Sequence, residues 1–81
     1  MNRTEALDLV KESIIDVIPD ADVAALGPDD PFRDALEMDS LDFLSFIEVL
    51  SERAGVRIED EDTRQLSTLS GSADFLVFHT R

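Results

Sequence analysis

The residues with the clearest chemical potential lie at the middle of the chain, in the stretch EMDSLD of residues 37–42. Ser40 follows Asp39, precedes Asp42 by two residues and stands directly before an apolar run of helical spacing. A hydroxyl in the first turn of a helix lies near free backbone N–H groups and the positive end of the helix dipole, which favour an attached phosphate diester. Serine is also an ordinary residue at a helix start. By itself this pattern makes Ser40 a candidate modification site.

The other reactive residue types do not form a recognisable catalytic or metal site. The sequence contains no G-x-S-x-G elbow, P-loop or H-E-x-x-H motif. Its single histidine, His79, lies near the C-terminus, where we expect a cation close to a helix end. The acidic clusters at 20–22, 29–30 and 59–62 lack the spacing of a calcium-binding loop. We therefore expect neither an enzyme nor a dedicated metal site.

Composition narrows the class of protein and of partner. With 81 residues and no cysteine, the chain is expected to form a single domain over residues 1–81, in the cytoplasm and as a monomer. A formal net charge of -12 repels nucleic acid and anionic lipid heads, and no apolar run suits membrane insertion. Hydrophobic residues make up 43% of the chain at regular spacing, which argues against disorder. Because acidic residues concentrate between residues 37 and 62, we expect a basic partner there.

The first element predicted is a helix over about residues 3–18. Asn2 and Glu5 can form a capping box at its start, and Pro19 cannot continue it. Its apolar stripe consists of Leu7, Val10, Ile14, Val17 and Ile18. Residues 19–38 then form a long first loop rich in turn-forming residues, with a short helical turn expected near 22–26. We expect four apolar residues to hold the loop on the core: Val23, Leu26, Phe32 and Leu36.

A second helix is predicted from about residue 40 to residue 54. Asp39 is a suitable N-cap, and Gly55 supplies a left-handed C-terminal position with Val56 able to add a hydrophobic contact. One stripe of this helix is apolar: Phe43, Phe46, Ile47, Leu50 and Ala54. The opposite face carries Leu41, Leu44, Ser45, Glu48, Ser51 and Glu52, below Ser40. An apolar strip beside acids suits docking by a basic protein with an apolar notch.

The last third of the chain predicts two more helices. The acids at 59–62 suit the first turn of a short third helix that ends near Leu66. Thr68 can cap a fourth helix, whose apolar face is formed by Leu69, Ala73, Leu76 and Val77. No alternating β pattern is present. The predicted fold is an all-α small bundle of three main helices plus one short helix, with a long first loop.

The motif Asp39-Ser40-Leu41, preceded by Leu36 and followed by Asp42, resembles the phosphopantetheine attachment motif of acyl carrier proteins. The resemblance spans nearly the whole chain. It includes the size, the acidity, the long first loop, a serine at the head of the second helix, a short acidic third helix and a Thr68-capped fourth helix.

This resemblance implies that a phosphopantetheinyl transferase, using coenzyme A and magnesium, attaches a 4′-phosphopantetheine arm to Ser40. Acyl groups would then be carried as thioesters on the thiol of the arm, in fatty-acid, polyketide or specialised lipid biosynthesis, by a free-standing carrier that is not itself an enzyme. In the family, the second helix is the recognition helix, and the second and third helices can part to shelter the acyl chain. By position, Leu41, Leu44, Glu48 and Glu52 would dock partners such as acyl-loading ligases or synthases with basic patches, and Asp39, Leu41 and Asp42 would flank the anchor.

The sequence departs from the housekeeping fatty-acid carriers of this family at several positions. Those proteins usually have a glycine after the leucine of the loop, where this chain has Glu37, and they often have acids where it has Ser45 and Ser51. The departures indicate a specialised carrier with a dedicated partner. Two alternatives remain open on sequence grounds: an aminoacyl or peptidyl carrier on the same arm, and an unmodified acidic helical module that binds a basic partner.

Overall fold

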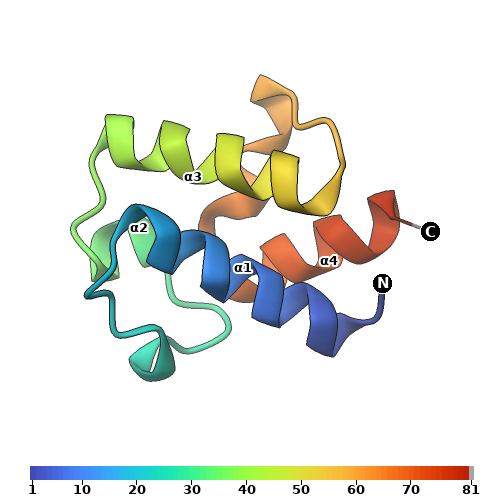
Figure 1. Cartoon of the computed structure of the whole chain (residues 1–81). Coiled ribbons are helices and arrows are strands. Elements are labelled where there is room, and N and C mark those ends of the chain that lie inside the picture. The colour runs from blue at the N-terminus through green and yellow to red at the C-terminus, as the bar shows by residue number, and fades with distance from the viewer. Residues whose placement is uncertain (81) are drawn as a thin grey trace.

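The computed structural model describes residues 1–80, and every regular element in that range is helical (Figure 1). The elements in chain order are α1 (Arg3–Val17), the 3-10 turn η1 (Val23–Ala25), α2 (Phe32–Ala35), α3 (Ser40–Ala54), the 3-10 turns η2 (Asp60–Asp62) and η3 (Gln65–Ser67), and α4 (Leu69–His79). The predicted all-α fold with three main helices is confirmed. The short helix predicted over about 59–66 consists instead of two separate 3-10 turns, and the one short α-helix is α2, inside the long first loop.

Helix α1 begins and ends close to the predicted residues because both signals are local. The Asn2 side chain accepts a hydrogen bond from the Glu5 backbone N–H at 2.8 Å, which is one half of the expected capping box. At the other end Ile18 leaves the helical conformation, with φ of -128°. Pro19 disfavours helical geometry in the residue that precedes it, so the helix closes at Val17.

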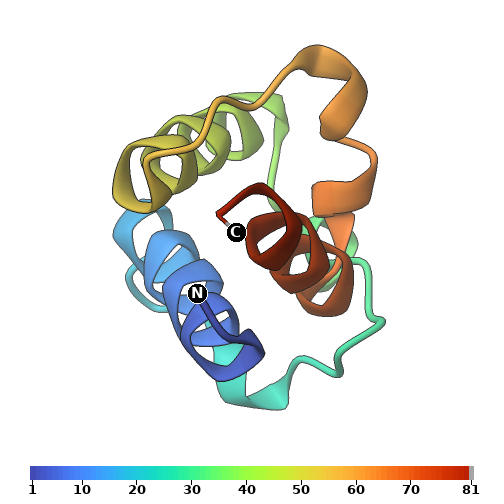
Figure 2. The same ribbon diagram turned by 90° about the vertical axis from the view of Figure 1, so that its right-hand side faces the viewer.

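The three long helices surround one core (Figure 2). Helix α1 packs against both α3 and α4, and α4 also contacts η3. The buried apolar residues are Ala6, Val10, Ile14, Phe32, Met38, Phe46, Leu50, Leu66, Leu69, Ala73, Phe75 and Leu76. On α3, the predicted stripe is centred correctly, since Phe46 and Leu50 are fully buried and Phe43, Ile47 and Ala54 pack at the edge of the core. On α4, Val77 is only half-buried, and Phe75, which the predicted stripe omits, is buried.

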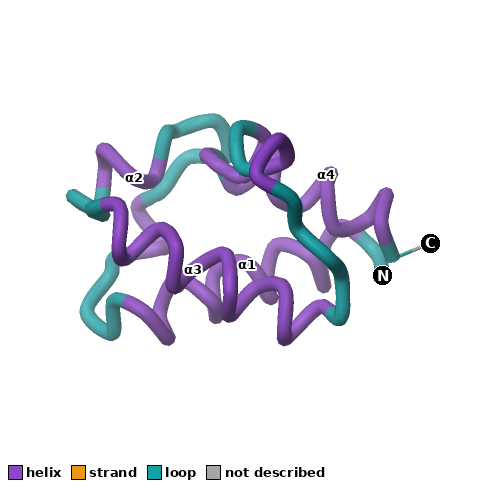
Figure 3. The backbone as a smooth tube through the Cα atoms, turned by 90° about the horizontal axis from the view of Figure 1, so that it is seen from above, coloured by secondary structure: helices purple, strands orange, loops and turns teal. Residues whose placement is uncertain are grey.

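The connection from α1 to α3 is held on the core as predicted, with loop on both sides of the short α2 (Figure 3). The Phe32 ring is fully buried and meets the Phe46 ring edge to face, with centroids 5.2 Å apart. Half-buried Val23, Leu26 and Leu36 pack around the same core. The Ser70 N–H also donates to the Pro28 carbonyl at 2.8 Å, which ties the loop to the start of α4. The loop is therefore part of the packed fold that carries α3.

The start of α4 depends on a glycine at residue 71. The Thr68 hydroxyl oxygen caps the helix by accepting from the Gly71 N–H at 3.0 Å. A Cβ at residue 71 would overlap the Gln65 carbonyl oxygen and lie 3.0 Å from the Thr68 Oγ1.

We expect Gly71→Ala to lower the free energy of unfolding by about 1–3 kcal/mol, because η3 would have to move away from α4. Urea denaturation of the two proteins measures this difference. An unchanged or higher midpoint would mean that η3 yields without cost, since alanine is intrinsically the better helix former.

Candidate functional site

Ser40 is exposed at the leading turn of α3, as the sequence predicts. It is the first residue of the helix, and Asp39 caps the helix by accepting from the Asp42 N–H at 2.8 Å. The Ser40 hydroxyl makes no hydrogen bond to any other residue in the range 1–80. Its oxygen is therefore accessible, beside unpaired N–H groups of the first helical turn and at the positive end of a 15-residue helix.

A tight turn between α2 and α3 positions this serine. Glu37 has a left-handed φ of 53°, its N–H donates to the Asp34 carbonyl at 3.3 Å, and the Met38 N–H donates to the Arg33 carbonyl at 2.8 Å. These two bonds are the Schellman pattern that ends a helix on a left-handed residue. Met38 is then only 5% exposed and belongs to the core. Ser40 therefore lies two residues after a side chain that is buried in the core.

Glycine is the residue best suited to position 37, because a side chain is strained at positive φ. We expect Glu37→Gly to raise the free energy of unfolding by about 0.5–1 kcal/mol, the relief of strain outweighing the extra freedom of the unfolded chain. Thermal denaturation of the variant and of Glu37→Gln, which keeps the strain and removes the charge, separates the two effects. Equal stabilisation by both substitutions would attribute the gain to charge and contradict the strain argument.

The predicted docking residues form a continuous exposed strip that descends from Ser40. Leu41 is 74% exposed and Leu44 is 53% exposed. Glu48 and Glu52 are also exposed and follow at helical spacing. We refer to these four residues as the docking strip: Leu41, Leu44, Glu48 and Glu52. Two neighbouring exposed leucines beside carboxylates give this helix face a small apolar patch with an acidic border.

Two residues near the docking strip differ from the sequence expectation. Ser51, which was predicted to lie on this outer face, is half-buried, and its hydroxyl donates to the Val56 carbonyl at 2.5 Å. It helps to end α3 together with Gly55, which has the predicted left-handed φ of 66°. Val49, which belongs to neither predicted face of α3, lines a hollow of about 460 Å³ together with Glu52, Asp16 and Arg53. The indication in the sequence is that Val49 is an apolar residue outside the predicted core stripe of α3.

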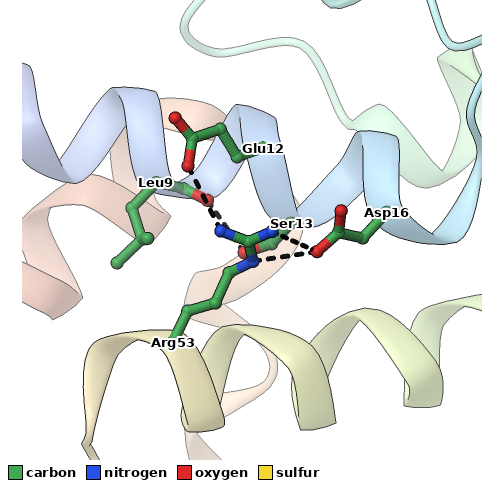
Figure 4. Close-up of polar contacts among 5 residues, drawn as sticks. All are labelled: Leu9, Glu12, Ser13, Asp16 and Arg53. Atoms are coloured by element: carbon green, nitrogen blue, oxygen red, sulfur yellow. Dashed lines mark hydrogen bonds and ion pairs between the residues drawn. The ribbon is translucent and has the colours of Figure 1, made fainter.

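Arg53, in the last turn of α3, joins this helix to α1 (Figure 4). Its Nε and Nη2 donate to one carboxylate oxygen of Asp16 at 2.8 and 2.5 Å, and its Nη1 lies 3.3 Å from the Glu12 carboxylate. Figure 4 also shows Ser13 on α1, whose hydroxyl donates to the Leu9 carbonyl at 2.8 Å and so needs no partner on α3. These ion pairs therefore link the last turn of α3 to the C-terminal half of α1.

We expect Arg53→Gln to lower the free energy of unfolding by about 0.5–1 kcal/mol at low salt and by less at high salt, because these ion pairs are partly exposed and are screened. Arg57→Gln is the control, since Arg57 is 87% exposed and pairs only with the nearby Glu59. Chemical denaturation at two ionic strengths measures both variants. A loss in Arg53→Gln no larger than in the control would show that the pairs with α1 contribute nothing.

The remaining candidate groups lie away from Ser40. His79 is exposed in the last turn of α4, with its ring 4.1 Å from that of Phe75, at the opposite end of the bundle from the start of α3 (Figure 1). Across residues 1–80, no three histidine or carboxylate side chains gather in the way a metal ion requires. Within the same range, no helix is both long and apolar enough to cross a bilayer.

Comparisons with known proteins agree with this geometry. Residues 8–76 match the family model described as phosphopantetheine attachment site. An acyl carrier protein of Rubrobacter xylanophilus is 34% identical over 79 residues, which cover 98% of this chain and 96% of the relative. An acyl carrier protein of Thermosynechococcus vestitus is 36% identical over 76 residues, covering 94% and 93% respectively. No solved structure gives a significant match. The chain therefore belongs to the acyl carrier protein family, whose members bear a phosphopantetheine arm.

Proposed function

We propose that residues 1–81 form one free-standing acyl carrier domain whose 4′-phosphopantetheine arm is attached to Ser40. The observation that carries this proposal is the exposed hydroxyl of Ser40, without an internal hydrogen bond, on the first residue of a long helix. An arm joined there has its phosphate diester near the backbone N–H groups of that turn. In this role Ser40 is an anchor and takes no part in catalysis.

Attachment requires Ser40 to act as the nucleophile in a transferase site. The Ser40 oxygen forms a bond to the phosphorus of the phosphopantetheine group of coenzyme A, the hydroxyl proton is lost, and the adenosine bisphosphate part leaves. The Asp39 carboxylate serves as the helix cap by accepting from the Asp42 N–H. We assign the general base to the transferase. The bound arm supplies the thiol that this cysteine-free chain lacks.

The docking strip is our proposed contact for the transferase and for the acyl-loading ligase or synthase. A partner with a basic patch and an apolar notch complements Glu48, Glu52 and the two leucines. Ser45 is exposed within this face and adds no charge. Together with Glu37 it supports a specialised carrier, in a dedicated fatty-acid, polyketide or lipid pathway, over a general elongation carrier.

Intact mass spectrometry tests the attachment. The purified chain is incubated with a transferase of broad specificity, coenzyme A and magnesium, and we expect one phosphopantetheine mass increment, located on the peptide that contains Ser40. No increment with a transferase that modifies a known carrier in the same experiment would refute the proposal. That outcome would favour an acidic helical module that binds its partner unmodified.

A further inference from the structure

A polar cleft of about 580 Å³ opens beside α3, close to the proposed anchor. It is lined by Arg33, Phe43, Asp60, Glu61, Thr63, Arg64 and Ser67, which come from α2, α3 and the η2–η3 segment. Phe43 follows Ser40 by three residues and so lies about one helical turn from it. The cleft therefore lies within reach of a group carried on an arm at Ser40.

Arg33 is held in a defined place within the cleft. Its side chain is half-buried, and its guanidinium carbon lies 4.6 Å from the centre of the Phe43 ring. Stacking on an aromatic face fixes the planar guanidinium while its N–H groups stay available. It also covers one face of the ring of Phe43, the single apolar residue that lines the cleft. That face of the ring is therefore closed to an alkyl chain.

The two arginines of the cleft differ from the other arginines of residues 1–80. Arg3, Arg53 and Arg57 each form an ion pair with a nearby carboxylate. Arg33 and Arg64 form none with any acid of residues 1–80. With 19 acidic residues against seven basic ones, two cations without an internal partner in one cleft are unusual for this molecule. They are available to an anion brought from outside.

The other polar groups of the cleft are acceptors. The Thr63 hydroxyl donates to the Asp60 carbonyl at 2.7 Å, and the Ser67 hydroxyl donates to the Arg64 carbonyl at 3.0 Å. Their protons are already used, so the guanidinium groups are the donors left for a ligand. Asp60 and Glu61 are exposed carboxylates of the same lining and oppose an incoming anion.

On the basis of the attachment at Ser40, we propose that this cleft selects acyl cargo ending in a carboxylate and that Arg33 is the residue that determines this specificity. The cargo carboxylate accepts hydrogen bonds from the Arg33 guanidinium above Phe43, and Arg64 adds a second cation. The acids at 60 and 61 weaken the same interaction. Unsubstituted fatty acyl chains of equal length do not gain this contact.

The test compares adipyl and hexanoyl cargo, which have equal chain lengths and differ in the terminal carboxylate. Both are installed by the transferase from the corresponding coenzyme A thioesters, and loading is verified by intact mass. The rate of thioester cleavage by hydroxylamine is then measured and divided by the rate for the free coenzyme A thioester. We expect adipyl cargo to be protected roughly three- to fivefold more than hexanoyl cargo, as for a partly exposed ion pair.

Three variants make the assignment specific. Arg33→Gln should remove the extra protection of adipyl cargo, whereas Arg57→Gln, an exposed arginine outside the cleft, should keep it. Glu61→Gln removes one opposing acid and should increase the protection, a gain that a misfolded variant would not give. Equal protection of the two cargoes, or the same loss in both arginine variants, would overturn the inference while leaving attachment at Ser40 intact. Failure to load either cargo would overturn the proposed function and this inference with it.

Discussion

Ser40→Ala is expected to abolish the phosphopantetheine mass increment completely. The substitution removes the one oxygen that forms the bond, and alanine at the first helical position leaves the Asp39 cap and its bond to the Asp42 N–H in place. The helix should therefore remain folded, and unfolding measurements should give a stability within about 0.5 kcal/mol of the parent chain, as for an exposed substitution.

Ser45→Ala is the matched control for this result. Ser45 is an exposed serine on the same helix, but it lies more than one turn beyond the leading residue and is remote from the free N–H groups. Its substitution should leave a full increment at an unchanged or slightly lower rate. If Ser40→Ala still gains the increment, another hydroxyl is the anchor and the geometric argument at the leading turn is wrong.

The site could be anticipated because the signals that place it are local. Asp39 and Gly55 set the two ends of α3, and both ends fall where the capping rules put them. The exposure of Leu41 and Leu44 then follows from helical periodicity once Phe46 is assigned to the core. Each of these features depends on a few residues that are close in the chain, and it can therefore be predicted from the sequence alone.

Features that depend on packing across the molecule were missed. Met38 is buried although no periodic pattern includes it, because the left-handed turn at Glu37 directs the chain back onto the core. Phe75 is buried because α4 packs against both α1 and η3, which widens its apolar face beyond a single stripe. The polar cleft is a third case, since it brings Arg33 beside residues about thirty positions later in the chain.

In residues 59–67 the local pattern predicts the start of a helix correctly but not its length. The acids at its start do form a capping box, in which the Glu59 and Asp62 side chains each accept from the other residue's backbone N–H. Leu66, however, has φ of -89° and ψ of 25° and is fully buried. Burial of this side chain takes precedence over continued helical geometry, and two short turns result.

Phe46→Ala is expected to lower the free energy of unfolding by about 3–5 kcal/mol, through lost burial and a residual cavity. The Phe46 ring is fully buried and contacts Phe32 edge to face and the nearby Phe43, so its removal takes away an aromatic contact that holds the long loop on the core. A loss of this size approaches the whole stability of a small domain. Circular dichroism should show that the variant is already partly or fully unfolded at room temperature, before heating.

The control for that measurement is Leu44→Ala on the outer face of the same helix. Leu44 is 53% exposed, and its truncation should change the free energy of unfolding by about 0.5 kcal/mol or less. The two variants therefore distinguish the buried face of α3 from its exposed face. Phe46→Ala loses the fold, whereas Leu44→Ala keeps the fold and loses part of the docking strip. If both melt alike, the buried and exposed faces of α3 have been exchanged, and Ser40 could not stand at the head of a free surface.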